Sequence, residues 1–229
     1  IPCTHNQLLS YDPTTGVPDP TNEALYTAAD RLDRYGFSGW IGPDAGVDAK
    51  SPLNTGSSVK SGQRGRDVSF AEQGVELIQE LDHDRSAAPW LVVCSFVNPH
   101  DIAEFNQEAI DSGLYDFSVD GPVPADEDLF LPDEWKASHG EDLSNKPTAQ
   151  ASYRDNYAVW GGSIPEDIGP HYRRFYYQLH KNLDEQMAKV MEALLASRFR
   201  DDTIVIFTSD HGEMLGSHGD LHQRFFQAY

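Results

Sequence analysis

Cysteine is scarce in this chain of 229 residues, which contains only Cys3 and Cys94. Two cysteines, one of them inside an apolar run, define no disulfide framework and do not fix the cellular compartment. No apolar stretch reaches the roughly 20 residues that a helix needs to cross a bilayer, so we expect no membrane insertion. The sequence also contains no Asn-x-Ser/Thr glycosylation acceptor.

Basic residues are scarce too, because 17 Lys and Arg stand against 37 Asp and Glu, a formal net charge of -20. Such a surface repels phosphate backbones and anionic lipids, so we expect neither nucleic acid nor a membrane as a partner. If the substrate is an anion, the site itself must supply positive charge through a metal ion, histidines or arginines. The composition does not indicate an oligomeric state.

Apolar spacing predicts helices over residues 21–36, 67–84 and 172–194. Thr21 or Asn22 is expected to cap the first helix. Asp67 is expected to cap the second.

Two near-continuous apolar runs, 90–97 and 203–209, predict strands that are buried on both faces. The order of elements is then helix, strand, long insertion, helix, strand. This order predicts an α/β fold, a mostly parallel sheet with helices on both faces. We expect residues 1–229 to belong to one such domain, with an irregular acidic insertion at about 102–168.

Polar residues follow both predicted strands. Asn98, His100 and Asp101 follow the first strand, and Asp210 and His211 follow the second. Ligands of parallel sheets gather outside the carboxyl ends of strands, so the two ends are expected to converge.

A carboxylate suits Ca²⁺ or Mg²⁺, and an imidazole suits Zn²⁺ or Mn²⁺, so Asp210 and His211 are candidate metal ligands. The competing interpretation is a capping aspartate beside a solvated histidine. Glu213 is either a support for the metal ligands or a helix-start acid.

His100 follows Pro99, which ends the strand and places the imidazole on a fixed corner. An imidazole there could bind an anionic ester oxygen or protonate a leaving group, although a turn that merely contains a histidine is the simpler interpretation. His218 and His222 are four residues apart, but the segment reads H-G-D-L-H and not the zinc-protease pattern H-E-x-x-H.

Together these motifs resemble those of a known family. The segment TIVIFTSDHGEMLGSHG resembles the carboxy-terminal metal motif of the sulfatase family, within the alkaline-phosphatase-like superfamily. WLVVCSFVNPHD is similar to the second strand signature of that family. RYGFSGWIGPDAG, YYQLHKNLDEQMAKVMEAL and LHQRFFQAY also look like bacterial arylsulfatase-type sequences.

The resemblance implies a sulfuric ester hydrolase that cleaves a small anionic sulfate monoester with the help of a metal. In this family a Cys or Ser is converted to formylglycine, and a divalent cation, usually Ca²⁺, holds the nucleophile and the sulfate oxygens. Mn²⁺ and Zn²⁺ are the other candidates. Asp210 and His211 match two metal ligands, and His100 matches the histidine that contacts the sulfate. His222 or Arg224 would contact the substrate where many relatives have a lysine.

This sequence also departs from the family pattern. The first metal ligands, the Gly-Lys-Trp-His segment and the nucleophile motif Cys/Ser-x-Pro-x-Arg have no match, and Cys3 is followed by Thr-His-Asn. We therefore expect an incomplete central portion that is inactive by itself. Two other interpretations stay open: a phosphodiesterase or phosphonate monoester hydrolase on the same scaffold, and a non-catalytic sulfatase-like remnant.

Overall fold

A computed structural model describes residues 8–43, 56–57, 63–85, 88–123, 142–152, 156, 169–213 and 215. These ranges include the helices α1 (Pro20–Ala29), α2 (Arg66–His83), α3 (Gln107–Ser112) and α7 (Gly169–Ala196), with the 3-10 turns η2 (Asp33–Tyr35) and η4 (His100–Glu104). Residues 148–152 are helical too. None of the helices in these ranges is long and apolar enough to cross a bilayer.

The chain forms two compact units, which are described separately. The first unit contains Ile1–Asp101, Leu114–Asp116 and Asn182–Thr203. The second contains Ile102–Gly113, Phe117–Lys181 and Ile204–Tyr229. Helix α7 therefore contributes its first half to the second unit and its second half to the first.

Helix α1 starts earlier and ends earlier than the sequence predicted. Asp19 is its N-cap, because the carboxylate accepts hydrogen bonds from the N–H of Thr21 at 2.9 Å and of Asn22 at 3.3 Å. Pro20 at the first helical position suits this start, since its missing N–H would be unpaired there anyway. Asp30 ends the helix with φ 38°, a left-handed conformation that aspartate tolerates. The rest of the predicted helix is only the short turn η2.

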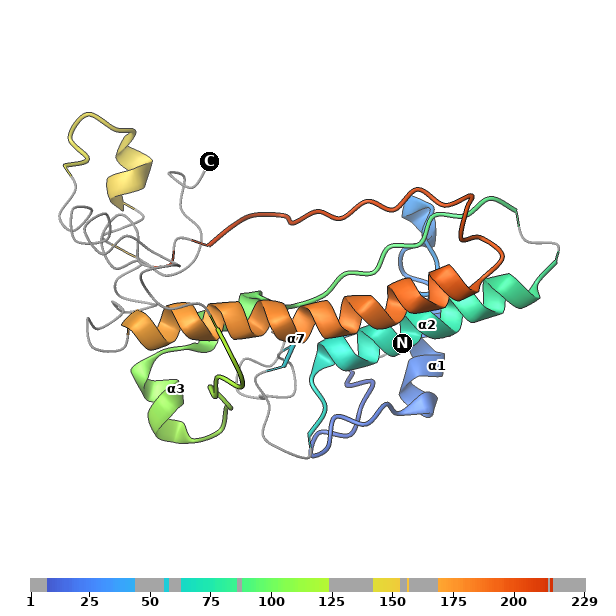
Figure 1. Cartoon of the computed structure of the whole chain (residues 1–229), viewed down its shortest axis with the longest axis horizontal. Helices are drawn as coiled ribbons and strands as arrows, with labels where there is room; N and C mark the ends of the chain where they lie inside the picture. The colour runs from blue at the N-terminus through green and yellow to red at the C-terminus, as the bar shows by residue number, and fades with distance from the viewer. Residues whose placement is uncertain are drawn as a thin grey trace. The chain divides into compact units, whose positions relative to one another are not determined.

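In the first unit, α2 packs against the second half of α7, and Figure 1 shows the two helices side by side. A Cβ added at Gly74 would lie 3.0 Å from Cys94 Sγ and 3.3 Å from Val190 Cγ2. The glycine therefore allows α2 to approach both α7 and the extended segment 88–97 closely. The long predicted helix is confirmed by α7.

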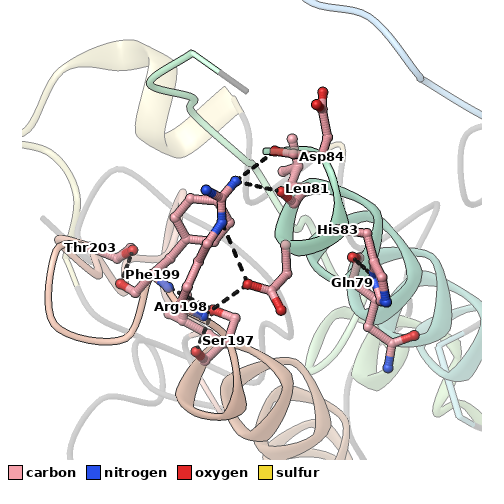
Figure 2. A network of polar contacts seen from close by, with 10 residues as sticks. Gln79, Leu81, His83, Asp84, Ser197, Arg198, Phe199 and Thr203 are labelled. Atoms are coloured by element: carbon pink, nitrogen blue, oxygen red, sulfur yellow. Dashed lines mark hydrogen bonds and ion pairs between the residues drawn. The ribbon is translucent and has the colours of Figure 1, made fainter. Parts of the chain in front are cut away.

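Arg198 joins the turn after α7 to the end of α2, as Figure 2 shows. Its Nη2 donates to the carbonyl oxygens of Leu81 at 3.0 Å and Asp84 at 2.7 Å. Its backbone N–H donates to Asp82 Oδ1 at 2.9 Å. A cation at these carbonyls also faces the negative end of the helix dipole. The contact stabilises the end of α2 against the end of α7.

The second unit is built around an aromatic core. Its buried members are Ile102, Phe105, Tyr172, Phe175 and Leu179. Helix α3 lies inside the segment that was predicted to be irregular. Asn106 caps it by accepting a hydrogen bond from Ala109 N–H at 2.9 Å, and Gly113 ends it with φ 59°. The asparagine and glycine signals of a short helix were present in the sequence, but six residues give too little periodicity to reveal it.

The two segments that were predicted to be buried strands are extended but have no strand partner among the described residues. In the first, exposure alternates from Leu91 to Phe96, so one face lies toward α2 and the other is open. In the second, Ile204 is 89% exposed and Phe207 is 76% exposed. The expectation of burial on both faces is wrong for this chain, because burial requires hydrogen-bonded neighbours at both edges and layers on both faces.

Candidate functional site

The predicted site residues fall into different parts of the chain. His100 belongs to the first unit, and Asp210 and His211 belong to the second. His222 and Arg224 lie outside the described residues. The convergence of the two strand ends, and the contacts of His222 and Arg224 with substrate, therefore stay predictions.

Asp210 and His211 lie side by side at the end of the second extended segment. His211 Nε2 is 3.3 Å from Asp210 Oδ2, and the His211 backbone N–H donates to Asp210 Oδ1 at 3.0 Å. His211 Nδ1 lies 2.9 Å from the Gly212 carbonyl oxygen, which favours the tautomer with the proton on Nδ1. In that tautomer Nε2 and the carboxylate are two neighbouring acceptors, which repel each other unless a proton or a cation lies between them.

This pair fits part of a metal site. Histidines that bind metals commonly donate the other ring N–H to a backbone carbonyl, as His211 does to Gly212. One carboxylate and one imidazole do not complete the coordination of any divalent cation. Within the part of the chain that the structure describes, no group of three or more His, Cys, Asp or Glu side chains could hold an ion. Two ligands alone do not make a site, so metal binding by Asp210 and His211 stays a prediction.

Glu213 anchors the loop that carries Asp210 and His211. Tyr172 Oη, from the buried face of α7, donates to Glu213 Oε1 at 2.9 Å. The N–H of Leu215 donates to the same oxygen at 3.3 Å, and Leu215 packs on the aromatic core. Burial and the negative charge of Glu213 raise the pKa of Tyr176 to about 12, so that neighbouring phenol stays protonated. Glu213 therefore supports the loop through these contacts, and the alternative that it begins a helix concerns residues outside the described ranges.

His100 begins the turn η4 and is exposed, whereas the residues on either side of it are not. Asn98 is 4% exposed and Asp101 is 2% exposed. The His100 N–H donates to the Val97 carbonyl oxygen at 3.0 Å, which closes the turn. The backbone is thus buried on both sides of an imidazole that faces outward.

Two buried carboxylates lie behind this turn. Asp67 accepts hydrogen bonds from the N–H of Val97 at 2.6 Å and of Asn98 at 3.1 Å. Burial raises the pKa of Asp67 to about 6, and the nearby charge of Asp101 adds to this, while the backbone N–H groups oppose it. The prediction that Asp67 caps α2 is wrong. Gly65 is the N-cap, and the Asp67 carboxylate instead accepts hydrogen bonds from the backbone at the end of the extended segment 88–97.

Sequence reasoning missed the role of both carboxylates. The usable signal was the position of Asp101 next to His100, immediately after an apolar run. For Asp67 the local signal favoured a cap, and its true partners are 30 and 31 residues away in the sequence. Such partners are visible only once the fold brings them together.

Comparisons with known proteins all identify sulfatases. The family model described as Sulfatase matches residues 5–229. The choline-sulfatase of Rhizobium meliloti is 28% identical over 159 residues, which are 67% of this chain and 27% of the relative. The iduronate 2-sulfatase of Mus musculus is 29% identical over 157 residues, again 67% and 27%. The Delta 4,5-hexuronate-2-O-sulfatase of Bacteroides thetaiotaomicron is 28% identical over 179 residues, 75% and 32%.

A solved structure gives the same result for the fold. A crystal structure described as a sulfatase from Bacteroides thetaiotaomicron superposes with a TM-score of 0.52 at 22% identity. It matches 100% of this chain, which covers 49% of that structure. The chain therefore spans about a third or less of the three curated relatives and about half of the solved structure.

Proposed function

This chain belongs to the sulfatase family, and from that premise we propose that the protein hydrolyses sulfate monoesters with the help of a divalent cation. The observation that carries the proposal is the family match over residues 5–229, which includes the polar residues after both extended segments. The relatives described above carry names of choline, iduronate and hexuronate sulfatases, which favour a sulfate ester over a phosphate or phosphonate ester.

In this proposal Asp210 and His211 hold the cation, with Ca²⁺ as the first choice. The carboxylate supplies a hard oxygen ligand, and His211 Nε2 lies beside it at 3.3 Å. When bound, the cation would stabilise negative charge that develops on the ester oxygens. His100 would bind an ester oxygen or protonate the leaving group. A cation and imidazoles would supply the local positive charge that a chain of net charge -20 otherwise lacks.

The sheet belongs to the same proposal. We infer that segments 90–97 and 203–209 are strands of a mostly parallel sheet in the intact protein, which would bring their carboxyl ends to one edge. The support is their extended backbone, the alternating exposure of the first segment and the open apolar side chains of the second. Hydrogen exchange would test this, since the N–H groups of 204–208 should be strongly protected in the intact protein. Rapid exchange there would contradict the sheet.

The function is tested with Asp210→Ala and His211→Ala in the intact protein, using 4-nitrophenyl sulfate and a metal analysis of the purified enzyme. Each substitution should lower kcat/KM at least about a hundredfold and reduce bound calcium, because loss of metal stabilisation removes several kcal/mol from the transition state. Asp201→Asn is the control, because its carboxylate is 93% exposed in the turn that precedes the same segment. Equal turnover in all variants would contradict the metal role.

The same measurements separate two alternatives. A faster reaction with the matching aryl phosphate or phosphonate would favour a phosphodiesterase or phosphonate monoester hydrolase. Calcium bound without turnover of any ester would favour a non-catalytic remnant. That outcome is of real interest here, because the nucleophile motif Cys/Ser-x-Pro-x-Arg has no match in residues 1–229.

A further inference from the structure

We propose that Asp67 and Asp101 are positioning residues that hold His100 in place by fixing the polypeptide from Val97 to Asp101, here called the His100 corner. The inference rests on the proposed function only for its catalytic consequence, because that proposal assigns His100 to the ester. The contacts themselves lie entirely within the first unit.

Asp67 holds the beginning of the corner. Its side chain leaves the first turn of α2 and is 1% exposed. One carboxylate oxygen accepts the N–H of Val97 at 2.6 Å, and the other accepts the N–H of Asn98 at 3.1 Å. Hydrogen bonds to an ionised acceptor are stronger than neutral ones. The start of α2 therefore fixes the two amides at which the extended segment turns.

Asp101 holds the end of the corner in the same way. Its Oδ1 accepts the N–H of Gly56 at 2.9 Å, and its Oδ2 accepts the N–H of Ser57 at 2.8 Å. Ser57 Oγ in turn accepts from Asn98 Nδ2 at 2.8 Å and from Asn182 Nδ2 at 2.9 Å. The short segment 56–57 is thereby bound to the corner at both ends and to α7.

The His100 corner is closely packed at Gly56. A Cβ added at Gly56 would lie 2.3 Å from Asp67 Oδ2 and 2.5 Å from Asn98 Nδ2. His100 itself points outward from this support, since it is exposed between the buried Asn98 and Asp101. The arrangement fixes the backbone on both sides of one side chain and leaves that side chain accessible.

Stability alone does not account for this choice of residues. Two neighbouring buried carboxylates cost desolvation and repel each other, whereas apolar side chains would fill the same space at lower cost. Their benefit is geometric, because four backbone N–H groups are directed to fixed oxygens. Sites that act on substrate need their groups held within a fraction of an ångström, and a misplacement of about 1 Å can lower a rate about a hundredfold.

The test is a double-mutant cycle on kcat/KM for 4-nitrophenyl sulfate in the intact protein, at a temperature where every variant is folded. Asp67→Asn and Asp101→Asn should each lower kcat/KM about 10- to 100-fold. In the His100→Ala background neither should lower it further, because a residue that acts through His100 has nothing left to position. Losses that are fully additive with His100→Ala would overturn the proposal.

Two further variants protect the test against simple unfolding. Ser57→Ala removes only the hydroxyl that accepts from Asn98 and Asn182, so it is a milder version of the same change and should show the same non-additivity. Ile78→Ala is the matched control, since Ile78 is buried in α2 about 16 Å along the helix axis from Asp67. It should lower stability and leave kcat/KM unchanged. An equal loss of activity in Ile78→Ala would overturn a specific role for the carboxylates.

Failure of the proposed function is recognised separately. If the intact wild-type protein hydrolyses no ester, the positioning of His100 is read from the NMR signals of ¹³C-labelled histidine. The His100 imidazole signals should shift in Asp67→Asn and Asp101→Asn and stay in place in Ile78→Ala. Unchanged signals in the two carboxylate variants would overturn the positioning proposal whatever the reaction is.

Discussion

Asn98 and Asp101, on either side of His100, are 4% and 2% exposed, whereas Asp210 has a carboxylate that is 84% exposed. The His100 corner and the residues Asp210–Glu213, here called the second corner, each follow an extended apolar segment. Both carry the residues of a candidate site. The first is fixed by hydrogen bonds to buried carboxylates, and the second is anchored through Tyr172 and Glu213. A corner of the first kind has its shape before a ligand arrives. We expect the second to gain its final shape from the cation and its remaining ligands.

Two glycines give the largest contrast between the corners. At Gly56 an added Cβ would lie 2.3 Å from Asp67 Oδ2, whereas at Gly212 it would meet nothing within 4 Å. Gly56→Ala should therefore lower the free energy of unfolding by about 3 kcal/mol, since overpacking a filled site costs about that much. Gly212→Ala should change it by less than about 1 kcal/mol. Urea denaturation measures both, and equal effects would show that the His100 corner is not filled.

The fold was partly predictable from the sequence. The periodicity of α7 extends over many turns, and a long amphipathic pattern survives most changes of context. The start of α1 was misassigned because Asp19, Thr21 and Asn22 are all good caps, and only the structure shows which side chain accepts the bonds. The exposure of segment 203–209 was not predictable, because an apolar run does not reveal which elements pack against it.

For the site, the sequence supplied residue types but not their supports. Asp210 and His211 could be predicted as metal ligands because a carboxylate and an imidazole follow an apolar run directly, and that role stays a prediction. Asp67 could not be assigned, since a helix-start aspartate normally caps its own helix and its partners lie far away in the sequence. Side chains that bind a ligand can be recognised from their residue type. Side chains that position those binding residues can be recognised only from their contacts.

The second prediction concerns pH. Burial raises the pKa of Asp67 to about 6 from an ordinary value of 3.8, so the folded state keeps this proton where the unfolded state has lost it. The contribution of Asp67 to stability is fully present below about pH 4 and is lost as the pH rises through about 6. The loss is at most about 3 kcal/mol, at about 1.4 kcal/mol per unit of pKa shift.

Denaturation of the wild type and Asp67→Asn between pH 4 and pH 7 isolates this contribution. The free energy of unfolding of the wild type should fall relative to that of the variant across the window. Taking the difference cancels the effect of the acidic residues that do not interact with Asp67; Asp101, whose charge acts on Asp67, is part of the measured contribution. A constant difference between the two proteins would mean that Asp67 is not buried as described.

The third prediction concerns the anchor of the second corner. Tyr172→Phe removes the hydrogen bond to Glu213 and keeps the ring in the aromatic core, so it should cost about 1.5 kcal/mol, typical of a bond to a charged group. Tyr177→Phe is the control, because Tyr177 lies on the same helix and is 37% exposed. Tyr172→Phe should also weaken calcium binding about tenfold, because substitution of a residue that supports metal ligands commonly lowers metal affinity. Calorimetry checks the affinity, and an unchanged affinity would mean that the anchor does not shape the metal loop.

Asp210→Asn should have the smallest effect on stability. Its carboxylate lies 3.3 Å from His211 Nε2 and is 84% exposed, so solvent screens its charge and the contact contributes little. Without calcium, the free energy of unfolding should change by less than about 0.5 kcal/mol, while turnover of the sulfate ester is lost. If Asp210→Asn instead destabilised the calcium-free protein strongly, the second corner would be as firmly fixed by its own contacts as the first. The distinction between a corner that is shaped in advance and one that is shaped by its cation would then not hold.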